Sequence, residues 1–123
     1  MAVASLALFQ LATAASAMCV YNSTESPQLR VDLACGWFCE NEWYIDPGGS
    51  NCRPGDGGLV SVYGGVPANG YVQDVEIVDV DDHGYVVIYS DYNGDPTYYG
   101  VCSYHQDHTL SDCTNMIPPN GGF

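Results

Sequence analysis

The sequence predicts an all-β fold, a small disulfide-stapled antiparallel β-sandwich of about seven short strands or a small barrel. Apolar and polar residues alternate within short segments, which is the pattern of half-buried strands. These segments recur roughly every ten residues and are separated by Gly, Pro, Asn and Asp, which favour turns. After the N-terminal apolar stretch, no segment shows the periodicity of a helix.

The strand segments can be justified in chain order from this alternation. In the clearest of them, Leu29, Val31 and Leu33 fall on one face. Arg30 and Asp32 fall on the other face, as expected for a strand with one side in the core. The segments predicted as strands are residues 19–24, 28–35, 42–49, 57–65, 71–80, 85–91 and 97–104.

Two stretches are predicted to lie outside the strands. The glycine-rich residues 47–58 are expected to form an ordered surface loop pinned by Cys52. Residues 115–123 are expected to form an extended tail, because Pro118 and Pro119 cannot enter a helix and the final glycines add freedom.

Residues 1–17 predict a secretory signal peptide. They contain no charged side chain, carry an apolar run from Val3 to Leu11, and end in Ala-Ser-Ala, which fits an Ala-x-Ala cleavage site. The run is too short to span a bilayer. We therefore expect a secreted, extracellular protein in which residues 18–123 form a single disulfide-rich domain, with no membrane-embedded part.

All six cysteines follow the predicted cleavage site. An even number of cysteines in a small secreted chain predicts three disulfides, each worth about 2–4 kcal/mol of stability. The sequence does not choose among the possible pairings, although Cys102 and Cys113 are spaced to close a local loop. The disulfide candidates are Cys19, Cys35, Cys39, Cys52, Cys102 and Cys113.

The charge balance is strongly acidic. Fifteen Asp and Glu residues stand against Arg30 and Arg53, giving a net charge of −13. Nucleic acids and anionic membrane surfaces are bound through Lys and Arg, so this balance argues against both as partners. It favours solubility, cation binding or an acidic medium.

Aspartates gather between residues 78 and 95 and raise the question of a calcium site. The spacing fails the EF-hand pattern, because His83 stands at the fifth position and Ser90 at the twelfth, between strands rather than helices. A looser calcium site remains a hypothesis, and the alternative is turns with solvated carboxylates. Its candidate ligands are Asp79, Asp81, Asp91, Asn93 and Asp95.

The strand that precedes these aspartates changes phase. Val75 and Ile77 share one face, whereas Val78 and Val80 share the opposite face. We expect a β-bulge near Ile77 that brings all four to the core side, with the turn of a β-hairpin after Val80. Without the bulge, the strand has two partly apolar faces.

Aromatic residues are the candidate binding groups. The chain has ten tyrosines and two tryptophans, and an exposed aromatic patch can bind glycan rings or protein surfaces. The alternative is that these rings pack the core, which aromatic residues in sheets favour. The candidate patch is Trp37, Tyr98, Tyr99 and Tyr104.

No catalytic motif is recognisable, and we assign no catalytic residue. The chain lacks a G-x-S-x-G sequence, and a carboxylate pair cannot be chosen from fifteen candidates. His105 and His108 have one spacing used in metal sites, but a polar loop is the simpler interpretation. Asn22 begins an Asn-Ser-Thr sequon and is a candidate for N-glycosylation.

Two resemblances complete the sequence analysis. Residues 64–72, "GGVPANGYV", resemble the segment of the fungal guanyl-specific ribonucleases that carries their phosphate-binding arginine, and Tyr71 stands at the arginine position. As a whole, the chain resembles the small secreted cysteine-rich proteins of filamentous fungi, which include effectors and antimicrobial proteins. This resemblance implies a monomeric, non-catalytic module that binds an extracellular protein or glycan of a host or cell wall. The alternatives are a small hydrolase, a non-catalytic ribonuclease relative and a calcium-stabilised structural domain.

Overall fold

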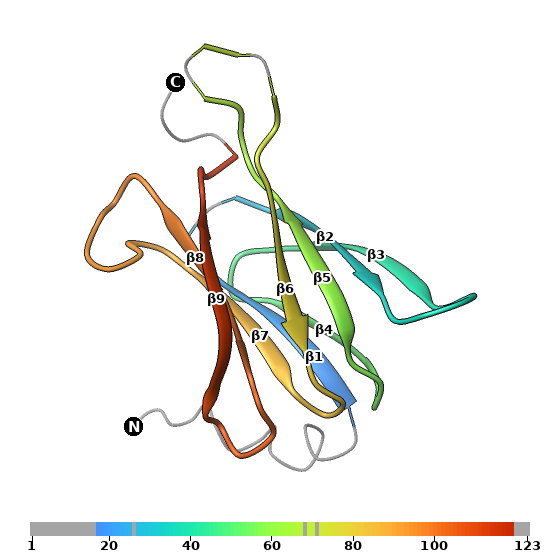
Figure 1. The fold of residues 1–123 in the computed structure, drawn as a ribbon. Helices are drawn as coiled ribbons and strands as arrows, with labels where there is room; N and C mark the ends of the chain where they lie inside the picture. Colours follow the sequence, from blue (N-terminus) through green and yellow to red (C-terminus); the bar gives the residue numbers. More distant parts are fainter. Residues whose placement is uncertain (1–16, 26, 68, 71, 120–123) are drawn as a thin grey trace.

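The computed structural model describes residues 17–25, 27–67, 69–70 and 72–119. Most of the predicted signal peptide, Tyr71 and the end of the predicted tail therefore lie outside the described residues. The described residues form nine strands and no helix, which confirms the all-β prediction (Figure 1). The strands are β1 Ala17–Ser23, β2 Leu29–Ala34, β3 Glu40–Ile45, β4 Ser50–Pro54, β5 Gly58–Tyr63, β6 Val75–Val80, β7 Tyr85–Tyr89, β8 Tyr99–Tyr104 and β9 Leu110–Met116.

The strands build two sheets that pack as a sandwich and do not close into a barrel (Figure 1). One sheet has the order β4-β1-β7-β8-β9, and the other has the order β3-β2-β5-β6. All paired neighbours are antiparallel, as predicted, except β1 and β7, which run parallel. In the part of the chain that the structure describes, no helix is long and apolar enough to cross a membrane.

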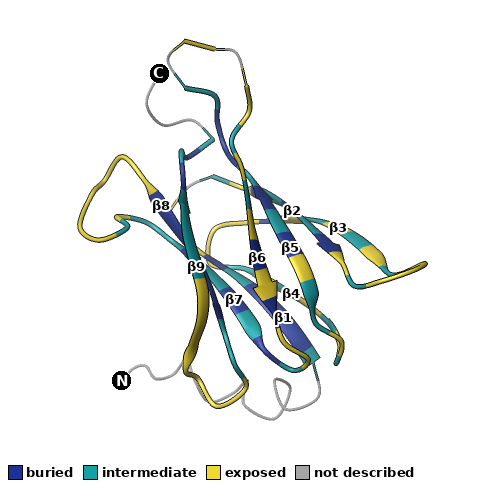
Figure 2. Ribbon diagram, viewed as in Figure 1, coloured by how far each residue is buried: buried dark blue, intermediate teal, exposed yellow. Residues whose placement is uncertain are grey.

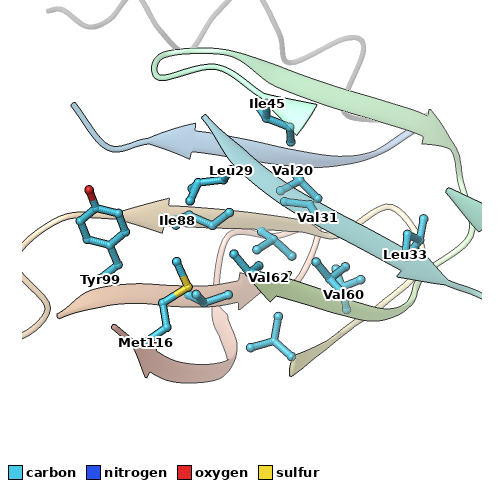
Figure 3. Close-up of a cluster of buried hydrophobic side chains, with 14 of the residues drawn as sticks. Val20, Leu29, Val31, Leu33, Ile45, Val60, Val62, Ile88, Tyr99 and Met116 are labelled. Atoms are coloured by element: carbon cyan, nitrogen blue, oxygen red, sulfur yellow. The ribbon is translucent and has the colours of Figure 1, made fainter. Parts of the chain in front are cut away.

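The core lies between the inner faces of the two sheets, where the buried positions follow the strand alternation (Figures 2 and 3). Leu29, Val31 and Leu33 of β2 are fully buried, as their phase predicts. Most other core residues are β-branched, a residue type that packs well on a pleated surface. The core also contains Met18, Val20, Ile45, Val60, Val62, Val78, Val80, Val86, Ile88, Tyr99, Val101 and Met116.

Two strands were missed by the sequence analysis, and both are edge strands with polar sequences. β4 lies within the segment predicted to be a loop, and its Cys52 sits directly opposite Cys19 of β1. β9 places Cys113 directly opposite Cys102 of β8. Both cross-strand pairs form disulfides, and the suggested Cys102–Cys113 loop is confirmed. The third disulfide joins Cys35 and Cys39.

The bulge predicted in β6 is absent, and the predicted hairpin after Val80 is wrong, because β6 and β7 lie in different sheets. β6 pairs with β5 in an unbroken register, so the phase of the strand does not reset. Val78 and Val80 face the core, whereas Val75 and Ile77 are left 38% and 52% exposed. The second interpretation, a strand with two partly apolar faces, is therefore correct. Its outer face is open to water, so the exposed Asp79 on that face needs no cation.

Side chains join the two sheets where β6 approaches the last strands. The Ser103 hydroxyl donates to the Asp79 carbonyl at 2.6 Å, and the Thr114 hydroxyl donates to the Glu76 carboxylate at 2.6 Å. Burial, followed by a hydrogen bond with Asp74, raises the pKa of Glu76. These contacts fix one side of the sandwich and leave the β2–β3 hairpin to project from the other (Figure 1).

Candidate binding surface

The β2–β3 hairpin ends in a small ring closed by a disulfide. Cys35 and Cys39 bond to each other, and the Cys35 amide donates to the Cys39 carbonyl at 3.0 Å. The Cys39 amide donates to the Gly36 carbonyl at 3.1 Å. Gly36 and Phe38 adopt φ angles of +122° and +60°, so the chain reverses within very few residues. For a bulky residue such as Phe38 a positive φ is unfavourable, and the covalent ring holds it in place.

Trp37 and Phe38 project from this ring into solvent. Trp37 is 90% exposed and Phe38 is fully exposed, the two largest exposures among the exposed large apolar side chains of the described residues. Their ring centroids lie 6.2 Å apart at an interplanar angle of 56°, so the two rings are tilted against each other. We call residues 35–39 the aromatic tip. Figure 2 shows it as the exposed end of the hairpin.

Trp37 was predicted from the sequence as a binding residue, whereas Phe38 was not. The signal was present, because two cysteines four positions apart enclose a glycine and an adjacent aromatic pair. A ring this small has no interior, so its side chains must point away from it. The pairing of Cys35 with Cys39 was needed to draw that conclusion, and sequence does not give pairings.

The outer face of the β3-β2-β5-β6 sheet carries a network of charged and aromatic side chains next to the aromatic tip. Arg30 of β2 lies 3.2 Å from the Asp32 carboxylate and 3.7 Å from that of Glu42. Its guanidinium also stacks 4.2 Å above the Tyr63 ring centroid. Tyr63 donates its hydroxyl to Asp32 at 2.9 Å, and Tyr44 donates to Glu42 at 2.6 Å.

These hydrogen bonds hold the two carboxylates in defined positions. Donation to Asp32 is the main cause that raises the pKa of Tyr63, and donation to Glu42 does the same for Tyr44. Beside the network lies an open hollow of about 400 Å³ at the base of the aromatic tip. Its lining residues are Asp32, Leu33, Ala34, Glu40, Asn41, Glu42 and Ser61.

The remaining aromatic candidates do not join Trp37. Tyr98 is 37% exposed in the β7–β8 loop, which lies across the molecule from the aromatic tip (Figure 1). Tyr99 is 9% exposed and belongs to the core, at the far end from Leu33 (Figure 3). Tyr99 is the first residue of β8 and faces the core, whereas Tyr98 precedes the strand. The prediction of one patch formed by all four residues is wrong.

Tyr104 belongs to a separate row of rings on the other sheet. It stacks on Tyr85 at 5.0 Å and 14°, and Tyr21 meets Tyr85 edge-on at 6.2 Å. The Tyr85 hydroxyl lies 2.9 Å from Nδ1 of His108. Because Tyr85 and Tyr104 cover each other's faces, we interpret this row as cross-strand packing.

The candidate calcium ligands are divided between two ends of β7. Asp79 and Asp81 stand before it, and the Asp81 carboxylate contacts His105. Asp91, Asn93 and Asp95 follow it, and the Asp95 carboxylate accepts bonds from the Thr97 amide and hydroxyl. Within the described residues, no group of three or more His, Cys, Asp or Glu side chains is placed to hold a metal ion.

The sequon residue Asn22 is 1% exposed, and its amide is fully bonded. Its Nδ2 donates to the Pro27 carbonyl at 3.1 Å and to the Ile45 carbonyl at 2.9 Å. Its Oδ1 accepts from the Thr24 amide and hydroxyl. A glycan on Nδ2 would replace one of these hydrogens and place a sugar in a buried position, so the geometry argues against glycosylation.

Comparison of the chain with protein-family models, curated proteins and solved structures finds no match. In the segment that resembles the guanyl-specific ribonucleases, Gly64 donates to the Asp74 carbonyl and Gly65 donates to the Ile117 carbonyl. The described part of the segment thus serves to connect β5 and β6 along the end of β9. The aromatic tip and the adjoining acidic face are the features on which a functional proposal can rest.

Proposed function

We propose that this protein is a secreted, non-catalytic binding module, of the effector or antimicrobial type, that docks on an extracellular protein through its aromatic tip. The observation that carries the proposal is the exposure of Trp37 and Phe38, at 90% and 100%, on a ring closed by a disulfide. Three disulfides in a small domain are consistent with an extracellular location. The fold gives no internal reason to expose these two rings, which favours an external one.

The geometry of the tip favours a protein over a glycan. A sugar chain stacks on flat aromatic platforms, and its hydroxyls need polar partners beside the rings. Trp37 and Phe38 are tilted by 56°, and the Phe38 ring has no hydrogen-bonding group. Two protruding, non-coplanar rings fit an apolar pocket of a protein, where Trp is enriched among the residues that dominate binding energy.

The fixed backbone of the disulfide-closed ring also supports a docking role for the aromatic tip. A flexible loop loses conformational entropy when it binds, at a cost of about 0.5–1.5 kcal/mol for each immobilised side chain, besides the backbone. Here the Cys35–Cys39 bond and two backbone hydrogen bonds fix the backbone before any partner arrives. The tip is therefore preorganised for docking.

The binding energy available from the tip can be bounded. Two large aromatic side chains together bury about 300–500 Å², which corresponds to about 8–12 kcal/mol at the usual coefficient. Association costs about 4–15 kcal/mol, and a micromolar complex needs a net −8 kcal/mol or so. The tip can thus anchor a complex, but neighbouring surface must add to it.

The test is binding of the oxidised protein to purified extracellular proteins on an array, with insoluble chitin and β-glucan as glycan arms. We expect saturable binding to a protein, abolished in the double variant Trp37→Ala/Phe38→Ala. Tyr98→Ala is the matched control, because it removes an exposed ring from the distant β7–β8 loop. Binding that survives in the double variant, or binding to the polysaccharides alone, would contradict the proposal.

A further inference from the structure

The surface that adjoins the aromatic tip is acidic on both arms of the hairpin. Glu40 directly follows Cys39, and Glu42 lies two residues further on the same face of β3. Asp32 stands opposite Glu42 in the β2–β3 pairing. All three line the hollow at the base of the tip. A partner that accepts Trp37 and Phe38 in a pocket therefore brings the rim of that pocket against these carboxylates.

The charges of the hollow are not balanced from within the protein. Three carboxylates, those of Asp32, Glu40 and Glu42, meet one guanidinium, that of Arg30, which leaves two negative charges. The chain's other basic residue, Arg53, donates to Asn41 at 2.9 Å from the neighbouring β4. Asn41 belongs to the face of β3 that alternates with that of Glu40 and Glu42. Arg53 therefore approaches β3 on the side away from these carboxylates.

The uncompensated carboxylates are also preorganised. The Tyr63 hydroxyl holds Asp32 and the Tyr44 hydroxyl holds Glu42, and the exposed Glu40 lies beside them. An incoming cation thus meets acceptors that are already in place. Carboxylates paired with Lys or Arg across a partly desolvated interface steer association and exclude partners of like charge.

We infer that the partner of the aromatic tip is a protein whose surface is cationic around an apolar pocket. Trp37 and Phe38 fill the pocket, and a Lys or Arg side chain of the partner enters the hollow between Glu40, Glu42 and Asp32. This inference rests on the proposed function and adds to it the chemistry of the partner. A neutral or acidic protein surface fits less well, because docking would take these solvent-accessible carboxylates out of water without giving two of the negative charges a partner.

The other surfaces of the molecule make weaker candidates. The row formed by Tyr21, Tyr85 and Tyr104 has ring faces that cover each other. The second hollow, lined by Asp81, Asp82, His105, Gln106 and Asp107, already has its histidine paired with Asp81. No apolar group exposed like Trp37 adjoins it among the described residues. Among the described residues, Trp37 and Phe38 of the aromatic tip are the most exposed large apolar side chains, and they lie beside the unbalanced charge of the first hollow.

The experiment uses three synthetic peptides of equal length as probes, titrated against the oxidised domain by calorimetry. One alternates Lys and Leu, one alternates Glu and Leu, and one alternates Lys and Ser. We expect the Lys/Leu peptide to bind at least about tenfold more tightly than either of the others, a difference that corresponds to about 1.4 kcal/mol. Raising the salt concentration should weaken its binding, because the charges lie at the surface.

Two charge variants then locate the interaction. Glu40→Gln/Glu42→Gln removes two charges from the hollow but keeps the acceptor for Tyr44. The matched control, Glu25→Gln/Asp91→Asn, also removes two exposed charges. Glu25 follows the end of β1 and Asp91 follows the end of β7, in the sheet that does not contain the hollow. We expect the first variant to lose at least about fivefold in affinity for the Lys/Leu peptide, and the control to lose less than about twofold.

The outcomes separate this inference from the proposed function. If the Lys/Leu and Glu/Leu peptides bind equally and both need Trp37 and Phe38, the docking role stands and the cationic partner is refuted. If the Lys/Ser peptide binds as tightly as the Lys/Leu peptide, and Trp37→Ala/Phe38→Ala does not weaken its binding, then binding is charge attraction alone and both proposals fail. Equal losses in the two charge variants also overturn the inference.

Discussion

Replacing Asn22 by Ala should destabilise the domain severely, because the hydrogen bonds of this side chain tie three backbone segments together. The side chain is buried and makes four hydrogen bonds. The substitution removes a hydrogen bond from three backbone groups, the carbonyls of Pro27 and Ile45 and the amide of Thr24. Each group left unsatisfied lowers the free energy of unfolding by about 1–3 kcal/mol, and water that enters the vacated space reduces the total loss.

We therefore expect a loss of about 3–5 kcal/mol from a total stability of about 5–15 kcal/mol. The assay is equilibrium unfolding in guanidinium chloride, with the disulfides intact and tryptophan fluorescence as the signal. Ser23→Ala is the control, because Ser23 is the exposed neighbour within the same strand. A loss below about 1 kcal/mol for Asn22→Ala would refute the reasoning.

The same geometry bears on the sequon. Protein secreted from eukaryotic cells should carry no glycan at Asn22, because both hydrogens of Nδ2 are bonded inside the fold. Intact mass before and after treatment with a glycosidase measures this directly. A folded, soluble protein that carries a glycan at Asn22 would show that this buried arrangement is not the native one.

The remaining predictions concern disulfides, pH and calcium. A disulfide that closes a longer loop stabilises the fold more, and the sequence separations are 33 for Cys19–Cys52, 11 for Cys102–Cys113 and 4 for Cys35–Cys39. Replacing both cysteines of a pair by Ser should therefore lower the free energy of unfolding by about 4, about 3 and about 2 kcal/mol in that order. Denaturant unfolding that ranks the three variants differently would contradict this explanation. The fold raises the pKa of Glu76 above its ordinary 4.5, so the protonated side chain stabilises the folded state. This contribution to the free energy of unfolding is fully present below the unfolded pKa and is lost as pH rises through the folded pKa. Glu76→Gln should therefore unfold at a higher temperature than the native chain at pH 7 and lose this advantage in acid, and an advantage that grows in acid would be the opposite of what burial predicts. Melting temperatures in excess chelator and in millimolar calcium should agree within about 1 °C, because the candidate ligands lie at two ends of β7; a clear rise in calcium would reveal a site that these positions do not explain.

The fold was predictable from sequence wherever a strand has one buried and one wet face. Leu29, Val31 and Leu33 show this alternation and were placed correctly. β4 and β9 do not show it, because edge strands with polar side chains read as loops. Their place in the sheets is set by pairing with β1 and β8, and only three-dimensional structure reveals such contacts.

The candidate site was predictable only in part. Trp37 could be singled out because cysteines enclose it, but the exposure of Phe38 depends on the Cys35–Cys39 pairing. The acidic hollow could not be foreseen, because Asp32, Glu40 and Glu42 come together through the β2–β3 register. Similarly, Tyr99 is aromatic in the same way as Tyr98, and only its phase in β8 assigns it to the core.

Whether the aromatic tip is the docking surface is decided by the affinity of Trp37→Ala/Phe38→Ala for the protein partner, measured beside the native chain and Tyr98→Ala. Both replaced rings are exposed, so the fold should survive and any loss can be assigned to the interface. The account predicts at least a hundredfold or so weaker binding for the double variant, because each anchor ring of this kind contributes about 2 kcal/mol or more, while Tyr98→Ala binds normally. Binding of the double variant within about threefold of the native chain would contradict the account, since the aromatic tip would then not be the docking surface.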